Sequence, residues 1–185
     1  SVLSADPTLT SLTLVTTCLA AAAGGVSSAI FSNILYKNYD LTMFMNGVLG
    51  GLVGITAGAD QMSPTDAVLI GIIAGVIIVL GVALIDRLKL DDPVGAVAVH
   101  LICGIWGTLA VGIFGEMAGL DQLLVQLAGV GIIGAFSVIC ATVIILIVKA
   151  VSGGSIRVSK EEELKGLDLT EHGMDAYADF RLNQH

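Results

Sequence analysis

Long apolar runs follow one another along almost the whole chain, separated by short polar breaks. The hydrocarbon core of a bilayer requires about 20 consecutive apolar residues per helix. The runs predict five membrane-spanning helices, over residues 9–36, 41–59, 67–85, 94–114 and 123–148. The second run is short, and the first is longer than needed, so we expect a tilted crossing or a partly interfacial start. We therefore expect an all-α, polytopic membrane protein.

Composition supports a membrane environment. The 185 residues are 55% hydrophobic and only 13% charged, whereas soluble domains carry roughly a quarter charged residues. Glycines recur at four-residue spacing, which lets membrane helices pack closely. These glycines are Gly50, Gly54 and Gly58, then Gly47 with Gly51, and Gly71 with Gly75. Close packing is the favoured interpretation, and the alternative is that one glycine face lines a narrow path.

Several functional classes are disfavoured by the sequence. The net charge of −8 provides no basic surface for nucleic acid. The cysteines show no spacing typical of a metal site. No nucleophile and base stand in a catalytic pattern, so we expect no enzyme, no catalytic residue, no metal and no cofactor.

The basic residues predict the orientation of the chain. Lys and Arg gather on the cytoplasmic side of membrane proteins. All eight lie in or beside the segments that follow the first, third and fifth predicted spans: Lys37, Arg87, Lys89, Lys149, Arg157, Lys160, Lys165 and Arg181. This pattern places the C-terminus in the cytoplasm and the Ser1 end outside.

The last part of the chain differs in character. We expect a membrane domain over residues 1–151 and a cytoplasmic tail over residues 152–185. Ser159 and Glu162 have the spacing of a capping box that opens a helix, and Gly166 is placed to end it. The tail is too short to be a domain.

His100 is the strongest functional candidate. Asp91, Asp92 and Pro93 resemble a helix start, with Asp92 as cap and Pro93 in the first helical position. His100 would then lie about 10 Å along the helix, inside the apolar slab. An ionisable residue at that depth is costly and is a functional hypothesis by default. The alternative is a core histidine that is hydrogen-bonded to a neighbouring helix.

Other intramembrane residues are expected to serve packing. The residues that would share a face with His100 are small or medium-sized, so the imidazole would face a crevice: Ala96, Val97, Cys103, Gly104 and Gly107. Thr16, Thr17 and Asn46 are expected to form interhelical hydrogen bonds, and Trp106 is expected to pack between helices.

Three segments resemble the ammonium transporter (Amt/Mep/Rh) family. Residues 46–58 are similar to its pattern NGxLAGLVGITAG, and residues 91–109 to DDPxxAxxxHxxCGxxGTL. Residues 157–177 are similar to RVxxEEExxGLDxxEHGxxAY. The three matches occur in order, span most of the chain and are closest to bacterial-type Amt proteins.

The resemblance implies an eleven-helix fold made of two inverted five-helix repeats and a final helix. This chain would supply the C-terminal half of a homotrimeric transporter with one pore per subunit. The implied function is nitrogen uptake across the inner or plasma membrane. Ammonium would lose its proton, and ammonia would pass along a histidine-lined apolar pore.

The resemblance also assigns roles to residues. His100 would be the second of two pore histidines, and Ser1 would recruit substrate in the outer vestibule. The tail would regulate transport, with a PII-type regulatory protein as a partner at the cytoplasmic face. Its regulatory positions would be Gly166, Asp168, Glu171, His172, Gly173 and Tyr177.

Three alternatives stay open. The chain could be an ammonium sensor module that signals to a partner, or a Rh-type gas channel, although the motifs are closer to Amt. It could also be inert by itself, because half of the pore wall would be missing. The absence of an initiator methionine leads us to expect a fragment or a processed product.

Overall fold

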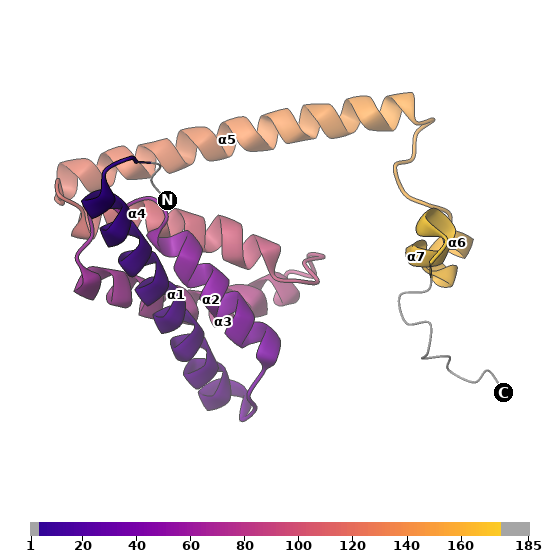
Figure 1. Cartoon of the computed structure of the whole chain (residues 1–185). Coiled ribbons are helices and arrows are strands. Elements are labelled where there is room, and N and C mark those ends of the chain that lie inside the picture. Colours follow the sequence, from indigo (N-terminus) through magenta and orange to yellow (C-terminus); the bar gives the residue numbers. More distant parts are fainter. Residues whose placement is uncertain (1–3, 175–185) are drawn as a thin grey trace. The chain divides into compact units, whose positions relative to one another are not determined.

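The computed structural model describes residues 4–174, and their regular elements are helices (Figure 1). This confirms the all-α prediction for the described part of the chain. In order, the elements are α1 (Pro7–Tyr36), α2 (Leu41–Ile55), α3 (Pro64–Arg87), the π-helix η1 (Val97–Ile102), α4 (Cys103–Phe114), α5 (Leu120–Val151), α6 (Lys160–Lys165) and α7 (Leu167–His172).

The observed helices differ from the predicted spans at their ends. The second helix ends at Ile55 rather than at residue 59, because residues 56–62 form turns. The third begins at Pro64 rather than at residue 67. There the Ser63 hydroxyl accepts from the Asp66 amide and the Asp66 carboxylate accepts from the Ser63 amide. This reciprocal cap starts the helix inside what the sequence presented as a polar break.

Within residues 4–174, four helical segments are long and apolar enough to cross a membrane: Pro7–Tyr36, Pro64–Arg87, Val97–Phe114 and Leu120–Val151. At 15 residues α2 is shorter. It spans about 22 Å, less than the hydrocarbon core of about 30 Å. The structure therefore supports a multi-pass membrane protein, and the fifth crossing stays a prediction.

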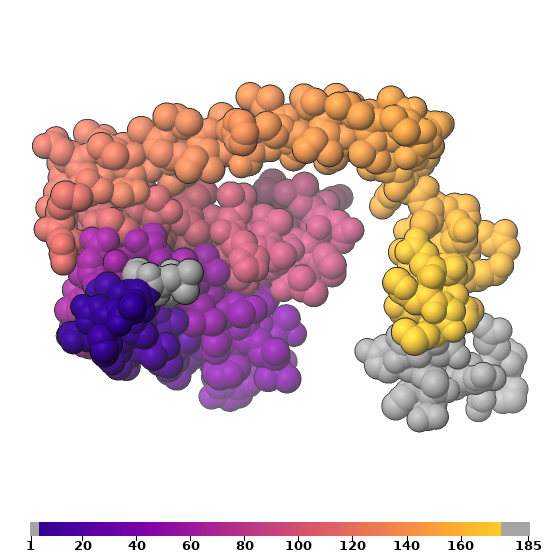
Figure 2. All heavy atoms as spheres, turned by 45° about the horizontal axis from the view of Figure 1, so that its top comes forward, coloured from indigo at the N-terminus to yellow at the C-terminus, as the bar shows by residue number. Residues whose placement is uncertain are grey.

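The chain divides into two compact units between Ile133 and Gly134, within α5. In the first unit, α1, α2 and α3 pack against one another, and α4 and η1 pack on α2 and α3. Figure 2 shows the atoms of these helices as one close-packed body. The predicted division at residue 151 separates membrane from cytoplasm and stays a prediction.

Glycines bring three helix backbones into contact. A Cβ at Gly51 would lie 2.8 Å from the carbonyl carbon of Ala20 in α1, and one at Gly71 would lie 2.9 Å from the same atom. Gly24 lies one turn after Ala20 in α1, and a Cβ at Gly47 of α2 would lie 2.6 Å from the Gly24 carbonyl oxygen. Side chains at these positions would clash, so the prediction that the glycines serve close packing is confirmed.

The other face of α2 receives α4. A Cβ at Gly107 would lie 2.6 Å from the carbonyl oxygen of Gly54. The Trp106 indole lies beside this contact and donates to the Ile70 carbonyl oxygen at 3.2 Å, which confirms its packing role. Thr16 in α1 donates to the Ala59 carbonyl oxygen at 2.7 Å. This bond between distant segments confirms the predicted role of Thr16.

Replacement of Gly71 by alanine should destabilise the first unit. The new methyl group would press on the Ala20 backbone, and overpacking of this kind costs about 1–3 kcal/mol. Gly131→Ala is the matched control, since no atom lies within 4 Å of its Cβ position in the helix α5. Thermal unfolding of the detergent-solubilised protein should show a lower midpoint only for Gly71→Ala. Equal midpoints would contradict the packing argument.

Candidate functional site

His100 lies in the π-helix η1, Val97–Ile102, which continues directly into α4. The Cys103 amide donates to the Ala98 carbonyl oxygen, five residues earlier. Short π-helical turns within α-helices are rare and occur frequently at functional sites. Sequence spacing gave no signal for this conformation, which now distinguishes His100 from an ordinary helical position.

The predicted helix start at Asp91, Asp92 and Pro93 is wrong. Residues 92–95 form a β-turn in which the Gly95 amide donates to the Asp92 carbonyl oxygen at 3.1 Å. Aspartate in the first position, proline in the second and glycine in the fourth are typical of a type I turn. The signal was therefore present in the sequence, but Asp-Pro also fits a helix start.

Asp92 still caps the helix from within this turn. Its carboxylate accepts a hydrogen bond from the Val97 amide at 2.9 Å. Gly95 has a left-handed φ of +74°, and its carbonyl oxygen accepts from the Val99 amide at 2.9 Å. Asp91 and Pro93 are exposed. The turn thus supplies the acceptors that the first amides of the helix require.

His100 is closer to the helix end than we expected. It is three residues beyond the start of η1, about 4.5 Å along the axis rather than 10 Å. Its side chain is exposed, whereas Cys103 and Gly107 are buried. The predicted shared face is therefore wrong for Cys103 and Gly107, because a π-turn changes the angular spacing of successive side chains, whereas Ala96 and Val97 are exposed as His100 is.

The opposite side of η1 packs against α3. Ala98 and Val99 are 0% and 1% exposed, and they belong to one apolar cluster with Ala74 and Ile78. The Cys103 thiol lies 3.8 Å from the Ala74 carbonyl oxygen. This packing fixes the helix and leaves the His100 imidazole on an uncovered face of the described chain. An imidazole there has a donor and an acceptor nitrogen in its neutral form.

One buried amide joins α2 to the turn before η1. Asn46 is 6% exposed, and its Nδ2 donates to the Val94 carbonyl oxygen at 3.0 Å. Asn46 was predicted to bond to another helix, and it bonds instead to the turn that precedes η1. The sequence did not indicate that its partner belongs to the loop that leads to His100.

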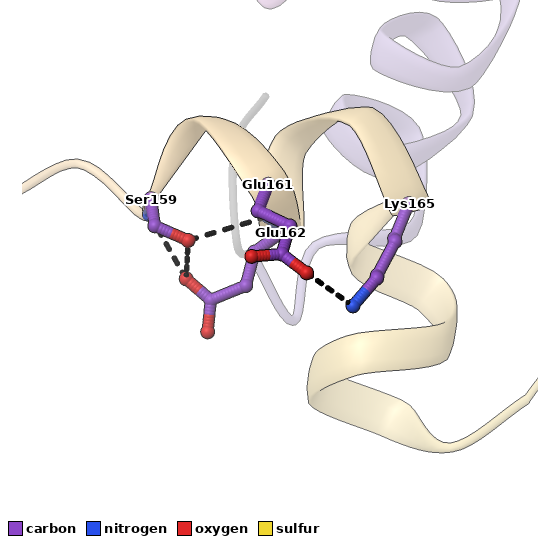
Figure 3. A network of polar contacts seen from close by, with 4 residues as sticks. All are labelled: Ser159, Glu161, Glu162 and Lys165. Atoms are coloured by element: carbon purple, nitrogen blue, oxygen red, sulfur yellow. Dashed lines mark hydrogen bonds and ion pairs between the residues drawn. The ribbon is translucent and has the colours of Figure 1, made fainter.

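The tail begins with the predicted capping box. Ser159 accepts from the Glu162 amide at 3.3 Å, and the Glu162 carboxylate accepts from the Ser159 amide at 2.9 Å (Figure 3). Glu161 and Lys165 form an exposed ion pair at 2.8 Å. Gly166 follows with φ +89° and ends α6. The predicted cap and stop are both confirmed.

The remaining predicted tail residues surround α7. Asp168, Glu171 and His172 are exposed on this helix. Gly173 ends it in the left-handed conformation, with φ +63°, and its amide donates to the Leu169 carbonyl oxygen at 3.2 Å. Tyr177 and Ser1 lie outside the described residues, so their predicted roles stay predictions.

Comparison with known proteins identifies the family. The model of the Ammonium Transporter Family matches residues 1–177. The chain belongs to the ammonium transporter family. The Synechocystis protein named "Putative ammonium transporter sll1017" is 44% identical over 166 residues, which are 89% of this chain and 37% of that protein.

Other family members extend the comparison. Ammonium transporter Amt1 of Haloferax mediterranei is 36% identical, over 90% of this chain and 32% of its own length. The solved structure named "Sensor Amt Protein" is 34% identical with a TM-score of 0.84, covering 91% of this chain and 43% of that one. The chain thus spans less than half the length of these ammonium transporter relatives.

Acidification should weaken the start of α6. The pKa of Glu162 is lowered from its ordinary value of 4.5, chiefly by the side-chain hydrogen bond with Ser159. Because this pKa is depressed in the folded tail, the charged carboxylate stabilises the cap above pH 4.5 and loses this effect as the pH falls through the lowered pKa. Helix signals of α6 in an NMR titration should decrease over that range.

Ser159→Ala should move the Glu162 pKa back toward 4.5. Ser155→Ala is the control, because the Ser155 hydroxyl contacts Arg157 rather than Glu162. If Glu162 titrates identically in the wild type, Ser159→Ala and Ser155→Ala, the hydrogen bond with Ser159 does not lower the pKa of Glu162.

Proposed function

We propose that this chain forms part of an ammonium transporter and contributes His100 to the wall of its pore. The observation that carries the proposal is the exposed imidazole on a rare π-turn, in a membrane-length helix of an ammonium transporter family member. An ionisable side chain is costly against lipid, so we infer that the face that carries His100 packs against another protein surface. The rest of the transporter subunit would provide it.

The physical reason for a deprotonation step is the cost of a bare cation in a narrow apolar path. Transfer of an ion from water into such a medium costs many kcal/mol, whereas a small neutral molecule such as ammonia pays far less. Ammonium would therefore release its proton at the outer entrance, and ammonia would pass along the imidazole edge. His100 can offer ammonia a hydrogen-bond donor or acceptor without placing a permanent charge in the path.

The assembly around this site is also a proposal. We infer that the chain supplies the last five spans of an eleven-helix, inverted-repeat subunit, with α2 as a short fifth crossing. This is consistent with the 37% and 32% of the curated relatives that the chain covers. Three subunits would form a homotrimer in the inner or plasma membrane.

Orientation follows from charge. Lys37 follows α1, Arg87 is the last residue of α3 and Lys89 follows it. Lys149 lies in the last turn of α5. Under the positive-inside rule these helix ends, and with them the C-terminus, face the cytoplasm. The Ser1 end would face the outside, where Ser1 would help to recruit ammonium.

The tail is proposed to regulate transport from the cytoplasmic side. Its capped helix α6 and the glycine-ended α7 give it defined local structure. A PII-type regulatory protein is the partner that we expect there, with contacts among Gly166, Asp168, Glu171, His172, Gly173 and Tyr177.

His100→Ala tests the central role. In the full-length protein, expressed in a host without its own ammonium uptake, loss of the imidazole removes a hydrogen-bonding partner of the permeating molecule. Such a loss costs about 1 kcal/mol, so methylammonium uptake should fall roughly five- to tenfold, or selectivity against other cations should change.

Leu101→Ala is the control for this test, since Leu101 is the next residue in η1 and is also exposed. It should leave uptake near the wild-type rate. If His100→Ala conducts with unchanged rate and ion selectivity, the proposed pore role is lost. Ammonium-dependent signalling without uptake in the wild type would instead favour the sensor alternative.

Gly173→Asp tests the tail. Aspartate, like asparagine, tolerates the left-handed φ of +63°, so the substitution acts through the negative charge that it adds at a helix C-terminus, which is unfavourable. Uptake should fall while assembly, measured by size-exclusion chromatography, stays intact. Gly173→Asn is the matched control, because asparagine has a similar size, tolerates this conformation and adds no charge. An unaffected uptake rate for Gly173→Asp would refute a regulatory role.

A further inference from the structure

One hydrogen bond from a buried side-chain amide holds the last residues of the loop that leads into the π-helix. Asn46 lies in the second turn of α2, which is capped by Asp40. Its Nδ2 reaches across to the Val94 carbonyl oxygen at 3.0 Å. Residues 88–96 contain two left-handed positions, Lys89 and Gly95, and their backbone bonds run back to the end of α3 or within the turn at Asp92. A tie from a packed helix therefore has a strong effect on its path.

The fit between Asn46 and Gly95 makes this tie specific. A Cβ at Gly95 would lie 2.6 Å from the Asn46 Nδ2 atom. No side chain fits between the amide and the loop, and the left-handed φ of +74° also favours glycine. The amide, the carbonyl of Val94 and the bare Cα of Gly95 thus form one close contact, which we call the Asn46 clamp.

The Asn46 clamp lies directly before the turn that carries His100. The Gly95 carbonyl oxygen accepts from the Val99 amide at 2.9 Å, and Val99 precedes His100. The far side of η1 is held against α3 by Ala98. Because one side of η1 packs against α3 and the Asn46 clamp holds the residue that supplies the first acceptor, backbone contacts fix the direction in which the His100 Cα–Cβ bond leaves η1.

We propose that Asn46 is a positioning residue for His100. Its amide holds the Val94–Gly95 peptide and thereby fixes the start of the π-turn from which the imidazole projects. This rests on the proposed pore role of His100. The role of Asn46 is indirect, since it lies behind the turn and acts through the backbone.

Asn46→Leu in the full-length protein is the first test, because leucine has a similar volume and cannot donate. Methylammonium uptake should fall about tenfold through misplacement of the imidazole, with the same change in cation selectivity as His100→Ala. Thr56→Val is the control on the same segment, because the exposed Thr56 hydroxyl bonds to the Leu52 carbonyl oxygen, one turn earlier in α2. It should leave uptake and selectivity unchanged.

The double variant Asn46→Leu/His100→Ala separates positioning from general damage. If Asn46 acts through His100, the double variant should match His100→Ala alone. If Asn46 only supports the fold, its loss should lower uptake by the same factor in both backgrounds, and the proposal is overturned. It is also overturned if Asn46→Leu leaves uptake and selectivity unchanged while His100→Ala does not.

Gly95→Ala covers the case in which Asn46→Leu fails to fold. The added methyl group would displace the Asn46 amide, so this variant should reproduce the change in uptake or selectivity that His100→Ala shows. Wild-type uptake and selectivity in folded Gly95→Ala would overturn the proposal. If His100→Ala itself has no effect, the proposed pore role fails first, and the role of Asn46 fails with it.

Discussion

The contact of α1 with the glycines of α2 and α3 is the constraint on which the rest of this unit depends. The carbonyl groups of Ala20 and Gly24 touch helix backbones where any side chain would clash. In a bilayer, helices gain little from burying apolar surface, so close van der Waals contact of this kind drives their association. The three helices form one block, and its position determines where the later elements can pack.

The packed helices α1, α2 and α3 determine the geometry of the candidate site. The second face of α2 receives α4 through Gly54 and Gly107, and α3 receives η1 through Ala74 and Ala98. Asn46 ties the intervening loop to α2. These contacts bury Ala98 and Val99 and leave His100 on the exposed side of η1, together with Val97 and Leu101. The exposed imidazole is therefore a consequence of packing, and in our account the missing contact surface is the other wall of the pore.

The sequence predicted features that depend on local chemistry or on long patterns. The apolar runs located the helices, glycine spacing predicted the close contacts, and Ser159 with Glu162 predicted the cap of α6. The prediction from sequence failed where one motif fits two structures: Asp92-Pro93 fits the start of a helix and the start of a turn, and here it begins a turn. The π-turn was not predictable, because it depends on how Ala98 and Cys103 fit against α3, which no local pattern records. The early end of α2 likewise reflects turns at residues 56–62.

An experimental structure of the full-length protein in lipid nanodiscs tests the central claim most directly. The account predicts that the His100 imidazole faces a narrow apolar conduit between this segment and the rest of the same subunit, with the Asn46 amide still bonded to Val94. Density for lipid acyl chains against the imidazole, or a conduit lined by another face of η1, would contradict it.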